Sequence, residues 1–105
     1  MNTIPNQTAP KAVLELLVKN HPGVMSHICG LFARRAYNLD AIVCLPVGDG
    51  DESRMWLRLD ETDRLPQIAA QVRKLQDVRE LTMRHEDDFA LFDKVATAAR
   101  PLQVT

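Results

Sequence analysis

Residues 13–28, VLELLVKNHPGVMSHI, contain the change of hydrophobic period that decides the fold. In the first six residues, VLELLV, side chains alternate between an apolar face and a second, more mixed face, which predicts a β-strand. The turn NHPG follows, and its proline fits the first turn of a helix, where backbone N–H groups lack partners. From Val24 a helix to about Ala36 is expected, because apolar residues now recur at helical spacing. Its apolar stripe consists of Val24, Ile28, Leu31 and Phe32.

The remaining elements follow from the same kind of pattern. Strands are expected at 39–47, 53–59 and 78–85, and a second helix between the last two, with Asp63 as its cap and Pro66 tolerated in its first turn. The apolar stripe of this helix consists of Leu65, Ile68, Ala69, Val72 and Leu75. The order strand, helix, strand, strand, helix, strand predicts an α+β, ferredoxin-like βαββαβ domain, with two helices on one face of a four-stranded antiparallel sheet.

The length of 105 residues corresponds to one domain. At this size about 65% of the unfolded chain's surface is buried on folding, which suffices for a core without disulfides or metals. The 46% apolar content excludes a disordered chain. We expect a flexible N-terminal arm at 1–11, the folded domain at 12–85 and a C-terminal tail at 86–105, which is either a short helix or a frayed end.

The net charge and the cysteines limit the expected partners and the cellular compartment. A net charge of −1 argues against a domain that mainly neutralises nucleic-acid phosphates. Residues 1–10 lack the basic residues and apolar core of a secretory signal, and the longest apolar run, 41–47, is far shorter than a membrane span. Cys29 and Cys44 form no C-x-x-C pair, which is typical of small apolar residues in a reducing compartment. We therefore expect a cytoplasmic protein that binds neither nucleic acid nor membrane.

Catalytic and metal-binding patterns are weak. Ser26 could be a nucleophile beside His27, but adjacent helix positions do not face each other, and no acid is placed to orient the histidine. His21, His27 and His85 form no short-spaced set of ligands, which favours solvated histidines. We expect no catalytic site and no metal site.

The loop before the first helix is suited to a carboxylate instead. Past its proline, the N–H groups of Gly23, Val24 and Met25 are expected to be free at the helix N-terminus, where the helix dipole attracts an anion. Asn20 and Asn38 each carry a donor and an acceptor, which suits the ammonium and carboxylate groups of a small zwitterion. The alternative is that the Pro-Gly pair is only a tight turn and both asparagines cap backbone groups.

Three motifs together resemble the signature of ACT domains, which are small regulatory modules that bind amino acids. They are N-x-P-G-V at 20–24, G-L-F-x-R-R at 30–35 and Y-N at 37–38. Over about 13–85 the chain is similar to the small regulatory subunits of acetohydroxyacid synthase (acetolactate synthase), in the short form found in bacterial isozyme I. One departure is Ala36, where many relatives have glycine.

The resemblance implies the fold derived above, a homodimer, feedback inhibition by valine, and activation of a separate catalytic subunit. Thiamine diphosphate, Mg and FAD are expected in that large subunit, and no cofactor in this chain. Matched by position, Asn20 and Asn38 are the effector-binding asparagines, and the amide of Gly23 meets the carboxylate. The expected site for valine, a branched-chain amino acid, consists of Asn20, Gly23, Val24, Met25, Asn38 and Leu39. The alternative function is a free-standing amino-acid sensor acting on a different target protein, and a third is an independent enzyme.

The second strand independently supports a dimer. In ferredoxin-like order it lies at a sheet edge, yet residues 41–45, AIVCL, are apolar on both faces and carry no charge that would protect an edge. Such a strand is expected to pair with its copy in a second subunit. A strand that is merely well buried is the alternative.

The third strand suggests a surface for the catalytic subunit. Arg54, Trp56 and Arg58 alternate with apolar residues that are expected to meet the helices, so they would lie on the open face of the sheet. Val13 and Leu17 of the first strand point the same way. Alternatively, the tail covers this face with its two phenylalanines, or a register slip of one residue places Trp56 in the core.

Overall fold

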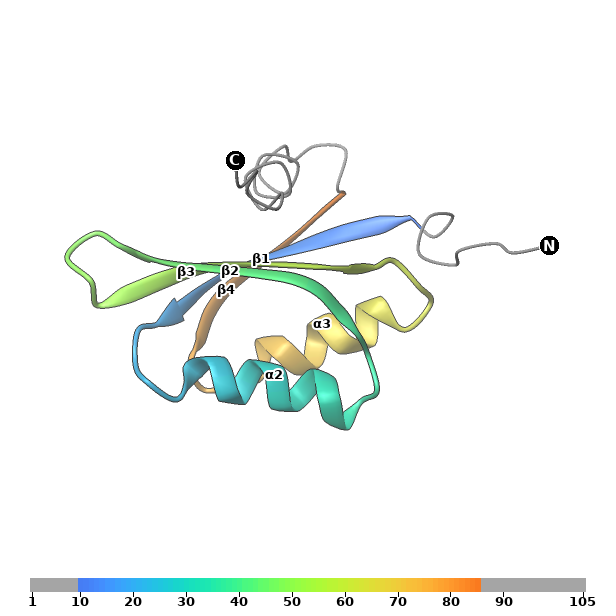
Figure 1. Cartoon of the computed structure of the whole chain (residues 1–105), viewed down its shortest axis with the longest axis horizontal. Coiled ribbons are helices and arrows are strands. Elements are labelled where there is room, and N and C mark those ends of the chain that lie inside the picture. The colour runs from blue at the N-terminus through green and yellow to red at the C-terminus, as the bar shows by residue number, and fades with distance from the viewer. Residues whose placement is uncertain (1–9, 86–105) are drawn as a thin grey trace, which may run out of the picture.

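The computed structural model describes residues 10–85 as two layers, a four-stranded antiparallel sheet with both helices on one of its faces (Figure 1). In chain order the elements are β1 (Lys11–Lys19), α2 (Val24–Arg34), β2 (Leu39–Val47), β3 (Glu52–Asp60), α3 (Leu65–Arg73) and β4 (Val78–His85). The strand order is β2-β3-β1-β4, so β2 and β4 are the two edges. The predicted ferredoxin-like βαββαβ fold is therefore confirmed.

The central strand is β1, which pairs with β3 on one side and with β4 on the other. Leu14 lies opposite Leu57 of β3 and Met83 of β4, on the face that carries the helices. Val13 lies opposite Arg58, on the other face. The alternation predicted from the sequence is thus the observed one, and the register slip that would bury Trp56 is excluded.

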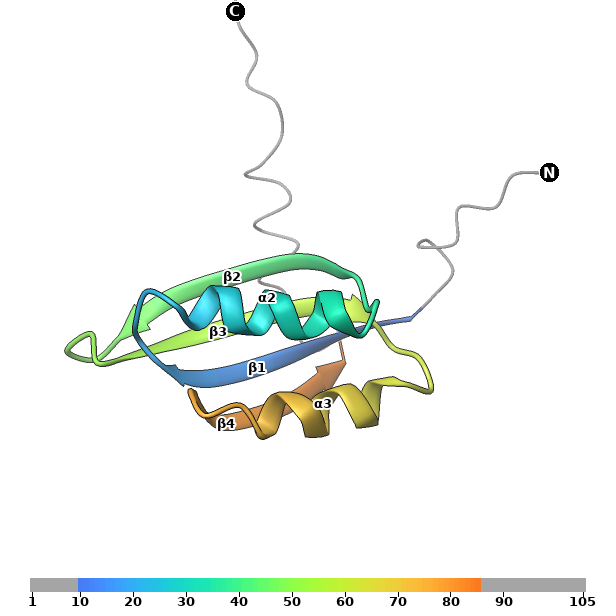
Figure 2. The same cartoon turned by 90° about the horizontal axis from the view of Figure 1, so that it is seen from below.

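The core lies between the sheet and the helices, with α2 on the β2–β3 side and α3 on the β4 side (Figure 2). Both predicted helical stripes are buried, except that Leu75 follows the end of α3 and packs at the margin of the core. The strands contribute Ala12, Leu14, Leu16, Val18, Met55, Leu57 and Leu59. Each fully buried aliphatic side chain of this kind contributes about 1.5–3 kcal/mol, so apolar burial is the main interaction between the two layers.

The start of β1 differs from the prediction, because Lys11 belongs to the strand rather than to the arm. Its Nζ lies 2.6 Å from Oδ2 of Asp40 and also contacts Asp60, so one cation ties the start of β1 to the neighbouring strands. Partial burial lowers the pKa of Lys11, but the hydrogen bonds to both carboxylates raise it above its ordinary value. The predicted arm and tail otherwise lie outside the described residues.

The predicted cap of the second helix is wrong. Asp63 makes no cap, since α3 begins at Leu65 with Arg64 in the cap position and no side-chain cap hydrogen bond. Thr62 stabilises this turn instead: its Oγ1 accepts the N–H of Arg64 at 3.2 Å, and its carbonyl accepts the N–H of Leu65 at 3.0 Å. A hydroxyl one residue earlier has therefore displaced the expected carboxylate.

The end of α2 depends on Ala36, whose φ of 53° places it in the left-handed region. The N–H of Ala36 donates to the carbonyl of Ala33 at 3.1 Å, and the N–H of Tyr37 donates to that of Phe32 at 2.9 Å. This is the Schellman pattern that ends many helices, usually with glycine at the left-handed position. The Phe32 and Tyr37 rings meet edge to face, with centroids 6.1 Å apart, and complete the motif. Alanine therefore adopts here the conformation for which glycine is the ordinary residue.

We predict that Ala36→Gly stabilises the domain by about 1 kcal/mol, because glycine removes the steric cost of the left-handed conformation. The free energy of unfolding in urea measures this gain. Ala33→Gly is the matched control, since Ala33 is exposed inside α2, and glycine there should destabilise by about 1 kcal/mol. Destabilisation by both substitutions would contradict the assignment of strain to Ala36.

Candidate functional site

Helix α2 separates the predicted valine-site residues into two groups. Its 11 residues correspond to about 16 Å of helix. Asn20 and Gly23 precede its first turn, and Val24 and Met25 lie within that turn. Asn38 and Leu39 follow its last turn, at the other end of the domain (Figure 2). One amino acid can contact both groups only if two copies of the chain contribute.

At the N-terminal end of α2, Asn20 is tied to the β2–β3 turn. Its backbone N–H donates to the carbonyl of Asp51 at 2.9 Å, and its Nδ2 donates to that of Gly50 at 2.7 Å. One of the two side-chain N–H donors is thus occupied by backbone, as the capping alternative predicts. The side chain is exposed and its position is fixed by the turn.

The N–H groups of this loop are less free than the sequence predicts. The N–H of Gly23 donates to Nδ1 of His21 at 3.0 Å, and that of Val24 donates to the carbonyl of His21 at 3.2 Å. Within residues 10–85, no acceptor takes the N–H of Met25. The expectation of three free donors is therefore wrong for two of them, because His21 folds back over the loop.

His21 belongs to a cluster that the sequence analysis missed. Its Nε2 lies 2.7 Å from Oδ2 of Asp77, and Nδ1 of His27 lies 2.9 Å from the same oxygen. The hydrogen bonds from His27 and His21 hold the pKa of Asp77 below its usual value. His27 and Asp77 are 50 positions apart, and Asp77 lies in the α3–β4 loop, where no periodicity operates. Only the topology, which brings that loop to the start of α2, could have indicated the contact.

Two histidines and a carboxylate within 4.8 Å of one another form a donor set that could hold a divalent metal ion. The hydrogen bonds do not fit this use. A neutral imidazole that binds a metal through Nε2 carries its proton on Nδ1 and donates it to an acceptor. Nδ1 of His21 faces the N–H donor of Gly23 instead. His85 is elsewhere, with its Nδ1 3.2 Å from Glu61. The hydrogen bonds therefore favour a proton, and not a metal ion, on Nε2 of His21.

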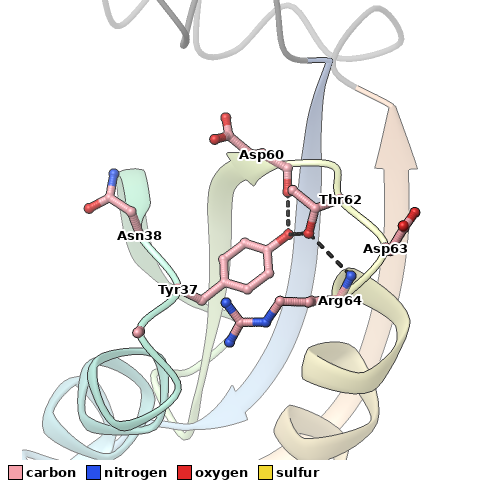
Figure 3. A pocket seen from close by; sticks show the side chains of 7 residues that line it. Tyr37, Asn38, Asp60, Thr62, Asp63 and Arg64 are labelled. Atoms are coloured by element: carbon pink, nitrogen blue, oxygen red, sulfur yellow. Dashed lines mark hydrogen bonds between the residues drawn. The ribbon is translucent and has the colours of Figure 1, made fainter.

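The C-terminal end of α2 borders a pocket of about 410 Å³ (Figure 3). The hydroxyl of Tyr37 contacts the carbonyl of Asp60 and lies 3.0 Å from Oγ1 of Thr62, while the guanidinium of Arg64 lies 5.3 Å from the centre of the Tyr37 ring. These contacts fix the pocket wall, and Asn38 lies at its rim (Figure 3). The main polar groups of the wall are thus already paired with one another.

A second pocket, of about 270 Å³, lies between α2 and β2. Its lining is mostly apolar, and Asn38 is a member of both pockets. The lining consists of Cys29, Phe32, Ala33, Tyr37, Asn38, Leu39 and Ile42. An apolar hollow with one amide at its rim suits a small aliphatic side chain attached to a polar group.

The open face of the sheet carries the residues predicted to meet a catalytic subunit. Leu17, Arg54, Trp56 and Arg58 are half-buried there, and Arg54 is paired with Glu15 at 2.7 Å. Val13 lies on the same face, opposite Arg58, and is fully buried. The alternative in which the tail covers this face lies outside the described residues.

The sequence disfavours Ser26 and His27 as a catalytic pair, and the structure gives His27 a different partner. Nδ1 of His27 is bonded to Asp77 rather than to Ser26. Within residues 10–85, no helix is long and apolar enough to cross a membrane.

The chain is similar to a consistent set of known proteins. Residues 14–80 match the model of the AHAS small subunit-like ACT domain. The acetolactate synthase isozyme 1 small subunit of Escherichia coli K12 is 48% identical over 91 residues, which is 87% of this chain and 94% of that protein. The acetolactate synthase small subunit of Haemophilus influenzae is 35% identical over 69 residues, or 65% of this chain and 42% of that protein.

Among solved structures, the acetolactate synthase small subunit from Thermotoga maritima superposes with a TM-score of 0.63 at 25% identity, covering 90% of this chain and 72% of that one. Sequence and structure therefore lead to the same relatives. This chain belongs to the family of acetolactate synthase small subunits, the non-catalytic ACT-domain regulatory subunits of that enzyme.

Proposed function

We propose that two copies of this chain bind valine between them and so regulate the catalytic subunit of acetolactate synthase. The observation that carries this proposal is the split site: residues suited to one zwitterion lie at opposite ends of α2. The cofactors of the reaction, thiamine diphosphate, Mg and FAD, are expected in the catalytic subunit and not in this chain. The two free cysteines are in keeping with a cytoplasmic complex.

The partly exposed edge strand β2 supports the proposed dimer. Every residue of this edge strand is at least partly exposed, and Leu45 is 51% exposed, whereas alternate residues of β3 are fully buried. An apolar edge strand without lysine is a template for pairing. A twofold axis beside β2 would join the two sheets through antiparallel β2 strands.

The same axis would complete the valine site. Because α2 lies on the β2 side of the sheet, two α2 helices would run antiparallel beside each other (Figure 2). The loop at Asn20 and Gly23 would then approach Asn38 of the partner subunit. The ligand carboxylate meets the N–H groups at the start of α2, the ammonium group meets the amide oxygen of Asn38, and the isopropyl group enters the apolar pocket.

The open face of the sheet is the proposed contact with the catalytic subunit. Trp56 lies in the middle of β3 with Arg54 and Arg58 on the same face, and tryptophan and arginine are frequent anchors of interfaces. This face is opposite the helices, so the catalytic subunit and valine would occupy different sides of the sheet.

We predict that Gly23→Asp lowers valine affinity at least tenfold, because the added carboxylate repels that of the ligand and displaces a charge-assisted hydrogen bond. A Cβ at this position would also lie 3.2 Å from Cε1 of His21. Calorimetric titration measures the affinity, and thermal unfolding verifies the fold. Ser26→Asp, which adds the same charge on the exposed face of α2, should bind nearly as the wild type. Equal losses in both variants would refute the specific role of Gly23.

We predict that Val43→Lys converts the dimer into a monomer and weakens valine binding at least tenfold. Val43 is the middle residue of β2, so a centred twofold pairing brings the two lysines face to face. Thr82→Lys, near the middle of the opposite edge strand β4, is the matched control and should remain dimeric. Sedimentation gives the mass. A Val43→Lys variant that is monomeric and keeps full valine affinity would rule out a shared site.

We predict that Trp56→Ala weakens association with the catalytic subunit by about 2 kcal/mol or more, with valine binding unchanged. Because Trp56 is only half-buried, the domain should stay folded, which thermal unfolding checks. Met83→Ala truncates an exposed apolar side chain on the helix-bearing face and should associate normally. A folded Trp56→Ala variant with wild-type affinity for the catalytic subunit would exclude the open face as the docking surface.

A further inference from the structure

The hydrogen bond between Gly23 and His21 assigns the protons of the cluster. The N–H of Gly23 can only donate, so Nδ1 of His21, 3.0 Å away, carries the lone pair. The single proton of this neutral ring is then on Nε2, which donates to Asp77 at 2.7 Å. In the ligand-free chain, His21 therefore occupies the backbone donor that the proposed function reserves for the ligand carboxylate.

We propose that His21 is a proton-coupled residue of the effector site. The ligand carboxylate replaces Nδ1 of His21 as the acceptor of the Gly23 N–H, and Nδ1 takes up one proton from solvent. His21 then holds two N–H groups, one directed to Asp77 and one directed to the carboxylate beside the Gly23 amide. This inference rests on the proposed function, and it adds a residue and a proton to that site.

The surroundings of His21 favour a positive ring once an anion is bound. Asp77 is the direct partner of Nε2, and its lowered pKa keeps it ionised at neutral pH. His27 is the second titratable group in contact, with ring centroids 5.8 Å apart and its own Nδ1 on Asp77. Lys19 and Asp51 are charged residues on the neighbouring segments, where their backbones bond Asp77 and Asn20.

Sharing one carboxylate limits the cluster to a single added proton. Two imidazolium rings 5.8 Å apart on Asp77 would repel each other, so protonation of His21 disfavours protonation of His27. The proton is drawn to His21 because only that ring contacts the loop amide that receives the carboxylate.

Linkage gives the direction of the pH dependence. The free state holds a neutral His21 and the bound state a protonated one, so binding takes up a proton and weakens as pH rises. The association constant should fall by up to tenfold for each pH unit wherever the free chain holds a neutral His21 and the complex a protonated one.

The test is calorimetric titration of the full-length chain with valine, in two buffers of small and large ionisation enthalpy, each with and without a chelator. The difference in heat between the buffers counts the protons taken up. We expect proton uptake on valine binding, at most one proton per bound valine, and tighter binding at lower pH. Heats that are independent of the buffer, or an uptake that the chelator abolishes, would overturn the proposal.

Two variants assign the proton. In His21→Gln the amide oxygen can still accept the Gly23 N–H but does not titrate, so valine should bind with no pH dependence and without the proton uptake. His27→Gln keeps the His21–Gly23 bond and should retain the uptake. Equal uptake in the wild type and His21→Gln, or loss of uptake only in His27→Gln, would overturn the role of His21. Failure of the proposed function is distinct, because then valine would produce no binding heat in any variant at any pH.

Discussion

Pairing of β1 with both β3 and β4 is the constraint on which the rest of the structure depends. It makes β1 an inner strand that runs between α2 and α3 when seen from the helix side, and the chain that leaves at Lys19 returns over the sheet as α2 (Figure 2). The loop before α2 is then held at the end of the sheet by two backbone bonds. The N–H of Lys19 donates to the carbonyl of Asp77, and that of Asn20 to the carbonyl of Asp51, each at 2.9 Å. Three loops far apart in sequence thus meet at one end of the domain.

Periodicity was sufficient for the fold because each element buries one regular face. The alternation in β1 and the apolar stripe of α2 predict which side chains face the core. The observed strand register and the buried residues of α2 agree with both predictions. The bounds of β2 and β4 match the predicted 39–47 and 78–85 for the same reason. Errors arose where local hydrogen bonds compete: Thr62 rather than Asp63 stabilises the turn before α3, since either side chain suits such a turn.

The candidate site was only half predictable. Backbone chemistry identified the loop at Gly23, because a glycine before a helix allows close approach of a ligand. The sequence could not show that the N–H of Gly23 already donates to His21. Asp77 holds the His21 ring in that place, and Asp77 lies in a loop that has no hydrophobic periodicity. The separation of Asn20 and Asn38 follows from the helix predicted between them, which α2 confirms. The motifs matched by position do not by themselves contain this separation.

A site completed by a second copy has a thermodynamic consequence that a self-contained site would lack. If valine contacts two chains, the free energy by which it favours the dimer equals the free energy by which dimerisation favours valine binding. The strand proposed as the dimer edge also lies beside the proposed partner surface, since Val43 of β2 is paired with Trp56 of β3. Side chains of these strands point alternately to the helix layer and to the open face. A shift of β2 on dimerisation would therefore move side chains on both faces of the sheet. We infer that β2 is the element through which the effector would influence the catalytic subunit, because among the elements of residues 10–85 it alone would adjoin the proposed second copy, the apolar pocket and the Trp56 face.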